Sequence, residues 1–134
     1  MEFSLSGVEK SYGDLHVLGG VSLEVERDGI LAVLGPSGCG KTTMLSMLAG
    51  LTAFDAGRID GLVGKAIGFL FQEPRLLDWR TAAGNILFVL KDVYPAMEAR
   101  RLAELYLERT GLGECRDVFP RRLSGGQRQR VAMA

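Results

Sequence analysis

The stretch Gly35-Pro36-Ser37-Gly38-Cys39-Gly40-Lys41-Thr42-Thr43 fits the pattern G-x-x-x-x-G-K-[ST] of a phosphate-binding P-loop. The apolar run at residues 30–34 comes directly before it and predicts a parallel strand buried on both faces. After the loop, apolar residues recur at the spacing of one helix face, at Met44, Met47, Leu48 and Leu51. The order of strand, glycine loop and helix predicts an α/β domain of the P-loop type.

Each residue type in this loop suits a nucleotide phosphate. Glycine takes backbone angles closed to other residues, so successive N–H groups can turn toward one phosphate chain. The helix predicted to begin near Gly40 adds its positive end at the same place. Lys41 supplies a mobile charge for the β- and γ-phosphates, and the Thr42 hydroxyl suits Mg²⁺. The alternative is a glycine-rich turn that happens to precede a lysine. The predicted phosphate site comprises Gly35, Pro36, Ser37, Gly38, Cys39, Gly40, Lys41, Thr42 and Thr43.

The composition narrows the class of protein. The chain has 134 residues, of which 47% are apolar, and this suits one globular domain or part of one. Its 16 basic and 16 acidic residues balance, which argues against nucleic acid or an anionic lipid surface as the main partner. No segment reaches the ~18 consecutive apolar residues of a membrane span. The start at Met1 shows no basic region or cleavable apolar core, so we expect no secretion. Cys39 and Cys115 lack metal-ligand spacing, which predicts reduced thiols in the cytoplasm.

The segments before the P-loop are predicted to form antiparallel strands. Apolar and polar residues alternate at 3–6 and again at 21–26, as expected of strands with one buried face. The turn-rich stretch 10–14 between them is predicted to be a loop that carries Tyr12. The Tyr12 ring either stacks on a nucleotide base or is a half-buried loop aromatic, and composition alone favours the second interpretation.

Two further strands are predicted after the P-loop helix. Residues 55–59 predict a turn and a strand, and residues 66–71 predict a strand that stops before Pro74. Gln72 stands at the end of the second strand. In a P-loop protein this side chain either reaches Mg²⁺ or an attacking water, or it is a surface cap.

From Thr81 onward the pattern becomes helical. Apolar residues repeat at helical spacing from 99 to 106, and Gly111 predicts the C-cap of that helix. The stretch Leu123-Ser124-Gly125-Gly126-Gln127 contains a capping box, so a helix is predicted to start there. Two glycines weaken a first turn, but they let an anion approach the helix N-terminus closely. The chain therefore has two predicted glycine-lined anion sites.

Together these motifs resemble the nucleotide-binding subunit of an ABC transporter. Residues 35–43 match the Walker A motif, and residues 123–127 match the family signature LSGGQ, which continues as RQRVAMA. Gln72 matches the Q-loop glutamine and Tyr12 matches the adenine-stacking aromatic, so the resemblance favours the functional interpretation of both. Residues 71–81 are similar to importers of the nitrate, sulfonate and taurine group, which usually have LLPW where this chain has Leu77-Asp78-Trp79.

The resemblance covers essentially the whole chain and implies a fold and residue roles. The fold would be an ABC-ATPase core of the P-loop NTPase class, with an antiparallel β subdomain and P-loop core at 1–72 and a helical subdomain with the signature at 73–134. Lys41 and Gln72 would be catalytic, and Thr42 and Gln72 would hold Mg²⁺. ATP would be bound by Tyr12, by the P-loop and by the signature of a second copy, through Ser124, Gly125, Gly126 and Gln127.

The implied function is that of the ATP-binding subunit of an importer, which couples ATP binding and hydrolysis to uptake of nitrate, sulfonate or taurine. It would act as a homodimer on the cytoplasmic face of the cell membrane, held there by permease subunits docked near Glu73 to Arg80. A solute-binding protein would be an indirect partner. The alternatives are a soluble ABC-type ATPase, such as a translation factor with a second tandem cassette, and a catalytically silent truncated fragment.

Two elements of the family pattern have no counterpart in the sequence. The signature helix ordinarily leads to a Walker B strand ending in Asp-Glu, whose carboxylates hold Mg²⁺ and orient water, and a switch histidine follows. The sequence stops at Ala134, inside the signature helix. The run 86–92 lacks the Glu and precedes the signature, and His16 precedes Walker A, so neither substitutes. We therefore expect an incomplete fold that does not sustain hydrolysis alone.

Overall fold

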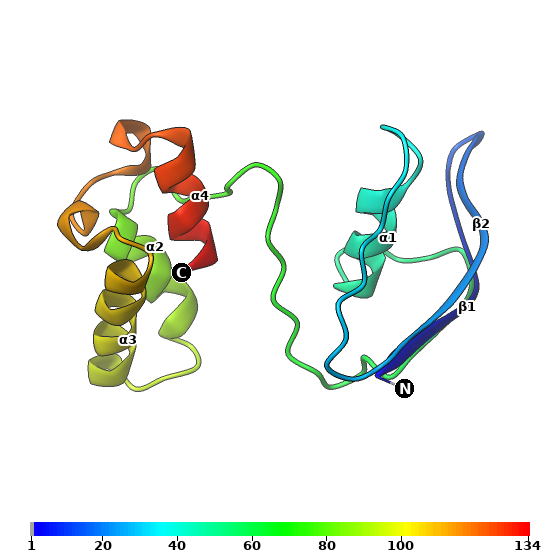
Figure 1. The fold of residues 1–134 in the computed structure, drawn as a ribbon, viewed down its shortest axis with the longest axis horizontal. Coiled ribbons are helices and arrows are strands. Elements are labelled where there is room, and N and C mark those ends of the chain that lie inside the picture. The colour runs from blue at the N-terminus through cyan, green and yellow to red at the C-terminus, as the bar shows by residue number, and fades with distance from the viewer. Residues whose placement is uncertain (1) are drawn as a thin grey trace. The chain divides into compact units, whose positions relative to one another are not determined.

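The computed structural model describes residues 2–134 as two compact units, Met1–Phe69 (unit 1) and Leu70–Ala134 (unit 2). Figure 1 shows the strands and the first helix in unit 1, and the other helices in unit 2. Among the described residues, no helix has both the length and the apolar character needed to cross a membrane.

Unit 1 contains an antiparallel sheet of three strands in the order β2-β1-β3. The strands are β1 (Phe3–Tyr12), β2 (Leu15–Val25) and β3 (Ala56–Asp60). β1 is central: its Leu5 pairs with Leu23 of β2 on one side and with Ile59 of β3 on the other. The alternation of apolar and polar residues thus predicted both strands before the P-loop correctly.

A bulge in β1 keeps its apolar residues on one face. Leu5 and Val8 are three positions apart, which would place them on opposite faces of a regular strand. The register shifts between them, Gly7 takes a positive φ of 59°, and its N–H donates to the Ser22 hydroxyl at 2.9 Å. This irregularity lets both side chains enter the core of unit 1. That core comprises Leu5, Val8, Leu18, Met44 and Met47.

The helix after the P-loop is α1 (Lys41–Leu48), which places Met44 and Met47 in the core of unit 1. The predicted helix extends to Leu51, and this is wrong. Gly50 has a φ of 70°, and the N–H groups of Gly50 and Leu51 donate to the carbonyls of Met47 and Ser46. This Schellman motif ends the helix and leaves Leu51 outside it.

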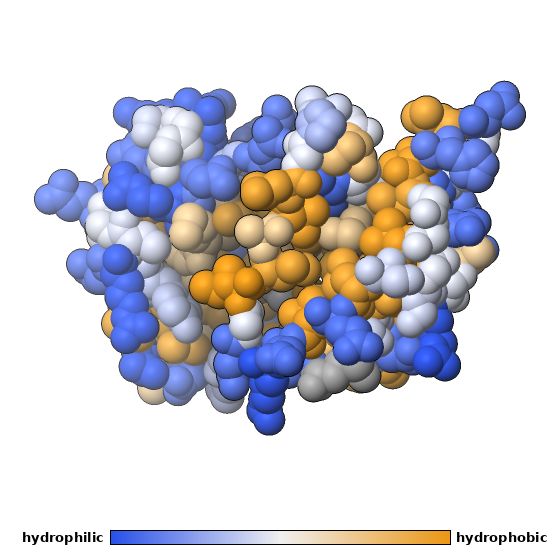
Figure 2. All heavy atoms as spheres, turned by 45° about the vertical axis from the view of Figure 1, so that its right-hand side comes forward, coloured by the Kyte–Doolittle hydropathy of each residue, from blue (hydrophilic) through white to orange (hydrophobic). Residues whose placement is uncertain are grey.

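Two predicted strands, at 30–34 and at 66–71, are wrong for the structure as described: both stretches are irregular. A buried parallel strand needs neighbours on both edges and covering layers on both faces. No strand of the described chain pairs with either stretch. Ile30 and Leu34 are consequently exposed, and only Val33 packs against the core of unit 1. The surface in Figure 2 accordingly shows broad apolar areas (orange) among the charged ones (blue).

The predicted loop at 10–14 is shorter in the structure. Residues 10–12 belong to β1, where Ser11 pairs with His16 and Tyr12 pairs with Leu15. The turn itself spans only Gly13 and Asp14. Tyr12 is therefore the last residue of a strand, and its backbone is held by a ladder of hydrogen bonds.

Unit 2 consists of α2 (Ala82–Leu90), α3 (Ala96–Arg109) and α4 (Gly125–Met133), with short 3-10 turns η1 (Gly113–Cys115) and η2 (Pro120–Arg122). Its core is separate from that of unit 1 and comprises Ala82, Ile86, Ala103, Leu107, Leu112, Leu123 and Val131. The helices form around this core because each places apolar side chains on one face.

The helix ends of unit 2 follow the capping residues. The Thr81 hydroxyl accepts the N–H of Gly84 at 3.1 Å and starts α2. α3 ends in a second Schellman motif: Gly111 has a φ of 67°, its N–H donates to Glu108, and the Leu112 N–H donates to Leu107. The predicted C-cap at Gly111 and the helical character of the chain from Thr81 onward are confirmed.

Candidate functional site

The P-loop wraps onto the start of α1, and glycine is required at the junction. Gly40 is the N-cap of α1 with a φ of 93°, a left-handed conformation that costs little only for glycine. A Cβ at this position would lie 2.8 Å from Leu18 Cδ2 and 3.0 Å from Val17 Cγ1, both on β2. The predicted helix start near Gly40 is confirmed, and packing against β2 fixes where the loop ends.

Lys41 turns its side chain back over the loop that precedes it. Its ammonium donates to the carbonyls of Gly35 at 2.8 Å and Pro36 at 2.6 Å, and lies 3.6 Å from Cys39 Sγ. The side chain and the loop backbone thus surround the same small volume. A phosphate there would meet the charge of Lys41 together with loop N–H groups.

The first turn of α1 keeps its positive end uncompensated. No side chain caps its N–H groups, and no acidic residue lies in the turn. The first N–H groups of a helix have no partner within the helix, so they attract an anion. Thr42 lies in this turn with its side chain exposed, and Thr43 is half-buried. Ser37, Gly38 and Cys39 are exposed in the loop itself.

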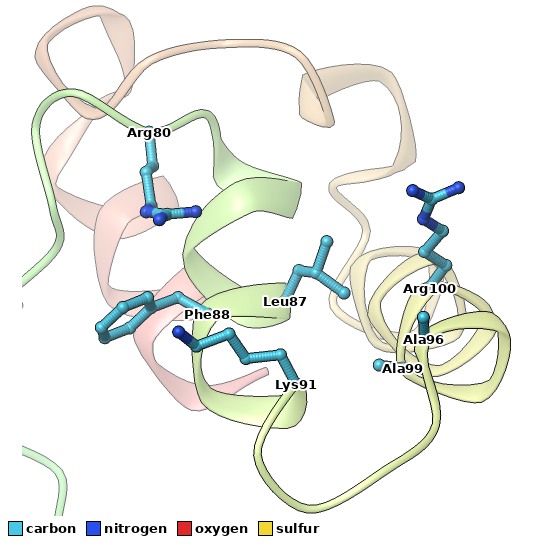
Figure 3. A pocket seen from close by; sticks show the side chains of 7 residues that line it. All are labelled: Arg80, Leu87, Phe88, Lys91, Ala96, Ala99 and Arg100. Atoms are coloured by element: carbon cyan, nitrogen blue, oxygen red, sulfur yellow. The ribbon is translucent and has the colours of Figure 1, made fainter.

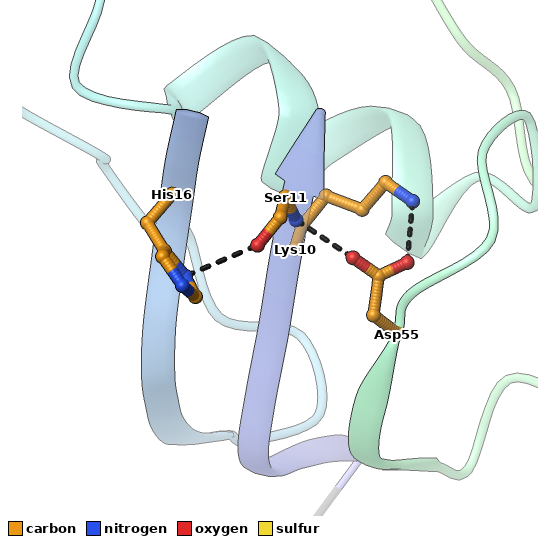
Figure 4. A network of polar contacts seen from close by, with 4 residues as sticks. All are labelled: Lys10, Ser11, His16 and Asp55. Atoms are coloured by element: carbon orange, nitrogen blue, oxygen red, sulfur yellow. Dashed lines mark hydrogen bonds and ion pairs between the residues drawn. The ribbon is translucent and has the colours of Figure 1, made fainter. Parts of the chain in front are cut away.

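Tyr12 stands at the end of β1 beside a polar network (Figure 4). The Asp55 carboxylate accepts from the Lys10 ammonium at 2.7 Å through one oxygen and from the Ser11 N–H at 2.7 Å through the other. Lys10 Nζ lies 5.2 Å from the centroid of the Tyr12 ring, which is 51% exposed. Across the hairpin, Ser11 Oγ lies 3.0 Å from His16 Nδ1.

The Asp55 network was not predicted from the sequence, and its charges explain its titration. The hydrogen bond from Lys10, and then that from the Ser11 backbone, hold the pKa of the Asp55 carboxyl below its ordinary value of 3.8. A signal was available: Asp55 directly precedes a strand that pairs with β1, and Lys10 is two residues from Tyr12, on the same face of a regular strand.

The signature stretch forms the N-terminus of α4 as predicted. The Ser124 hydroxyl accepts the N–H of Gln127 at 3.2 Å, and the Gln127 amide oxygen accepts the N–H of Ser124 at 2.8 Å. Gly125 and Gly126 are exposed, and a Cβ on either would meet nothing within 4 Å. Packing within unit 2 therefore does not explain the two glycines. Their exposed backbone leaves room for a ligand at the helix end.

Gln72 and the stretch from Glu73 to Arg80 lie at the start of unit 2, before α2. Gln72 is exposed. The loop after it is tied to α2 by Asn85, whose amide bonds to the backbone of Leu77, Arg80 and Thr81. Trp79 projects from this loop with 73% of its surface exposed. An exposed tryptophan on an anchored loop is a typical contact for a partner protein.

A groove of about 200 Å³ lies between α2 and α3 of unit 2 (Figure 3). Its apolar wall includes Leu87 and Phe88. The cations of Arg80 and Lys91 converge on the Phe88 ring, at 5.0 Å and 4.7 Å from its centroid. Arg80 Nε is buried and has no hydrogen-bond partner among the described residues. Basic side chains line this groove and acidic ones do not: Arg80, Lys91 and Arg100.

The structure gathers the predicted residues in two places. Tyr12 and the P-loop lie in unit 1, and Gln72 and the signature lie in unit 2. The two predicted Mg²⁺ ligands, Thr42 and Gln72, are thus in different units. Among the described residues, no group of three or more His, Cys, Asp or Glu side chains is placed to hold a metal ion. Cys39 and Cys115 are free thiols, and Cys115 Sγ lies 3.6 Å from Gln127 Nε2.

The family model for ABC transporters matches residues 18–134, which include the P-loop and the signature. The chain belongs to the ABC transporter family. The match explains why two glycine-lined helix N-termini occur in one short chain.

Known relatives narrow the family further. The chain is 44% identical over 137 residues to an aliphatic sulfonates import ATP-binding protein of Rhizobium johnstonii, covering 98% of this chain and 50% of that protein. It is 42% identical over 132 residues to a protein of the same name from Agrobacterium fabrum, covering 98% of this chain and 48% of that protein. The chain spans about half the length of the curated relatives it matches.

Solved structures give the same fold. A dimeric ATP-binding cassette in a post-hydrolysis state, bound to ADP and Pi, matches with a TM-score of 0.87 at 30% identity, over 98% of this chain and 67% of that one. A protein from Clostridium perfringens that is part of an ABC transporter complex matches with a TM-score of 0.79 at 28% identity, over 98% of this chain and 59% of that one. The fold is that of an ABC-ATPase cassette, as the resemblance implied, and the chain contributes part of it.

Proposed function

We propose that this chain belongs to the ATP-binding subunit of an ABC importer for an aliphatic sulfonate, in which ATP binding and hydrolysis drive solute uptake. The observation that carries the proposal is the P-loop of unit 1. Gly40 sets the loop against β2, and the Lys41 ammonium lies within 3 Å of two loop carbonyls. A loop built in this way suits the phosphates of a nucleotide. The names of the relatives favour import over a soluble translation factor.

In this proposal the residues of unit 1 bind ATP by its two ends. Lys41 contacts the β- and γ-phosphates, where negative charge builds during phosphoryl transfer. The backbone of residues 35–43 and the first turn of α1 contribute N–H donors. Tyr12 stacks on the adenine, which its half-exposed ring at the end of β1 permits.

Mg²⁺ would accompany the nucleotide, and the residues present suit it. The Thr42 side chain is an exposed oxygen donor in the first turn of α1, the ligand type that Mg²⁺ takes together with phosphate oxygens. Gln72 offers a second oxygen donor from unit 2. The ion would neutralise charge on the β- and γ-phosphates. Lys41 and the helix N-terminus add their positive charge to the same phosphates.

The signature would bind the nucleotide held by a second copy of the subunit. Ser124 Oγ accepts the Gln127 N–H, so its own O–H remains able to donate to a phosphate oxygen. The open backbone of Gly125 and Gly126 lets that phosphate approach the start of α4. Dimeric cassettes among the similar structures support this arrangement. A homodimer closed around ATP follows from it.

The stretch from Glu73 to Arg80 would dock the permease subunits at the cytoplasmic face of the membrane. Its support is the exposed Trp79 and the neighbouring groove, where Arg80 and Lys91 flank the Phe88 ring. These features suit a segment with apolar and acidic side chains. A solute-binding protein would act indirectly, by delivering the sulfonate to the permease.

The test is ATP hydrolysis by the full-length protein assembled with its permease subunits, for wild type and for Lys41→Ala. We expect the substitution to abolish turnover, because it removes the charge at the transferred phosphate. Thermal unfolding should show that the variant is folded. Equal turnover by the two proteins would contradict the proposal. Uptake of a labelled aliphatic sulfonate then tests the solute class separately from hydrolysis.

A further inference from the structure

The carboxylate of Asp55 joins three consecutive positions of β1 just before the residue proposed to stack on adenine. Its backbone N–H donates to the Glu9 carbonyl at 2.9 Å. One side-chain oxygen accepts from Lys10 and the other from the Ser11 N–H, each at 2.7 Å. Asp55 thus contacts residues 9, 10 and 11, and Tyr12 follows directly.

The sheet itself does not hold this end of β1 on the β3 side. The ladder between β1 and β3 ends with Glu9 paired to Ala56. Beyond that pair, β1 has a strand neighbour only on the β2 side, where Ser11 faces His16. A strand end with one neighbour would move easily. Asp55 supplies the missing partner, because its carboxylate accepts the Ser11 N–H that a third strand would otherwise accept.

Asp55 also fixes where the charge of Lys10 lies. Its ion pair holds the Lys10 ammonium 5.2 Å from the Tyr12 ring centroid, a distance at which a cation attracts an aromatic face. Figure 4 shows Lys10 and Asp55 side by side at this end of the sheet. The ring is thereby supported by a charge that is itself held in place.

We propose that Asp55 is a positioning residue for the Tyr12 ring, acting through Lys10 and the Ser11 amide, and that it thereby sets how much the nucleobase contributes to nucleotide affinity. The inference rests on the proposed stacking role of Tyr12. Asp55 does not touch the nucleotide. Its effect is confined to the base end, because the phosphate end is held by the P-loop.

The experiment compares the affinities of the full-length protein for ATP and for inorganic tripolyphosphate, which has the phosphates without the base. The ratio of the two dissociation constants measures the contribution of the base. Tyr12→Ala should lower this ratio about tenfold, since base–aromatic stacking is worth about that factor. Asp55→Asn and Lys10→Met should each lower it roughly two- to fivefold, as expected for a lost cation–ring contact. Tripolyphosphate affinity should not change.

Two controls separate positioning from a loss of fold. Asp60→Asn removes another carboxylate of the same sheet, one that pairs with Arg58 at 2.6 Å, and should leave the ratio unchanged. Lys10→Met keeps the bond between Asp55 and Ser11 and most of the side-chain stem, so it should fold even if Asp55→Asn does not. In the Tyr12→Ala background, Asp55→Asn should have no further effect on the ratio.

The outcomes distinguish this inference from the proposed function. If Tyr12→Ala lowers the ratio and neither Asp55→Asn nor Lys10→Met does, the positioning role is wrong and the stacking role stands. If Asp55→Asn weakens ATP and tripolyphosphate equally, Asp55 is a structural residue only. If Tyr12→Ala leaves the ratio unchanged, the stacking role and the positioning role are both wrong, while the P-loop assignment depends on tripolyphosphate binding and is judged by it alone.

Discussion

The side chain of Asn85 bonds to both polar groups of Leu77. Its Oδ1 accepts the Leu77 N–H at 2.7 Å, and its Nδ2 donates to the Leu77 carbonyl at 3.2 Å. This pairing imitates a strand partner, although Asn85 lies on α2. It holds the loop that carries Trp79 against the helix that begins at Thr81. The proposed docking surface therefore depends on a buried residue that lies outside it.

We predict that Asn85→Ala destabilises unit 2 by about 2–3 kcal/mol, because the N–H and carbonyl of Leu77 lose their partners in a site where Asn85 is only 7% exposed. Urea denaturation followed by circular dichroism measures this. Glu104→Gln is the control, since its ion pair with Arg116 is exposed at 3.6 Å and should contribute less than about 1 kcal/mol. Equal stability of the Asn85 variant and wild type would show that the loop does not need this anchor.

Gly40→Ala should destabilise unit 1 by about 2–3 kcal/mol and weaken nucleotide binding. The added Cβ would meet Leu18 and Val17 at 2.8–3.0 Å, and φ is positive at this position. Thermal unfolding and ATP affinity are the measurements. Gly19→Ala, on β2 with nothing within 4 Å, should change stability by no more than about 0.5 kcal/mol. If both variants behave alike, the close approach of the loop to β2 is not a constraint.

Gly126→Ala should separate stability from function. The new Cβ meets nothing within 4 Å and replaces a poor helix former in the first turn of α4, so stability should rise by about 0.5 kcal/mol. ATP-driven dimerisation should weaken about tenfold, because the methyl group obstructs a phosphate at the helix end. Analytical ultracentrifugation with and without ATP tests this. Unchanged dimerisation would remove the reason for glycine at this position.

Acid should destabilise unit 1 through Asp55. Lys10 and Ser11 lower the pKa of Asp55 in the folded state below the ordinary 3.8. A carboxyl with a lowered folded-state pKa contributes stability above its unfolded pKa, and that stability is lost as pH falls through the folded-state value. Urea midpoints measured from about pH 6 down to about pH 2 should therefore fall less steeply for Asp55→Asn than for wild type.

Glu2 is expected to add to the same acid dependence. Its ion pair with Lys65 lowers its pKa below the ordinary 4.5. Lys65→Met should therefore also flatten the acid limb of the stability profile. Profiles parallel to that of wild type for both Asp55→Asn and Lys65→Met would contradict these two assignments.

Local sequence patterns predicted the elements whose causes are local. The capping box at Ser124, the C-cap at Gly111 and the helix after Gly40 each depend on residues within a few positions of one another. The structure confirms all three. The alternation at 3–6 and 21–26 succeeded for a similar reason, since one buried face is enough to specify each strand.

The failures concern features that depend on distant residues. The apolar runs at 30–34 and 66–71 have strand composition, but a strand exists only with a hydrogen-bonded neighbour, and none of the described strands pairs with them. Asn85 was overlooked because an asparagine inside the apolar stretch of α2 has no local meaning. Its partners are backbone groups of a preceding loop. Asp55 was overlooked for the same reason, as its contacts are on β1.

The pairing of β1 with β3 has a consequence for the order of events in refolding. β1 and β2 form a hairpin between neighbours in the sequence, but Ser4 meets Asp60 only by closing a loop that contains the whole phosphate-binding segment and α1. Closing such a loop is slow compared with forming local helices. Helical signal from unit 2 should therefore recover before unit 1 binds nucleotide. A fluorescent nucleotide added during refolding would show this as a lag.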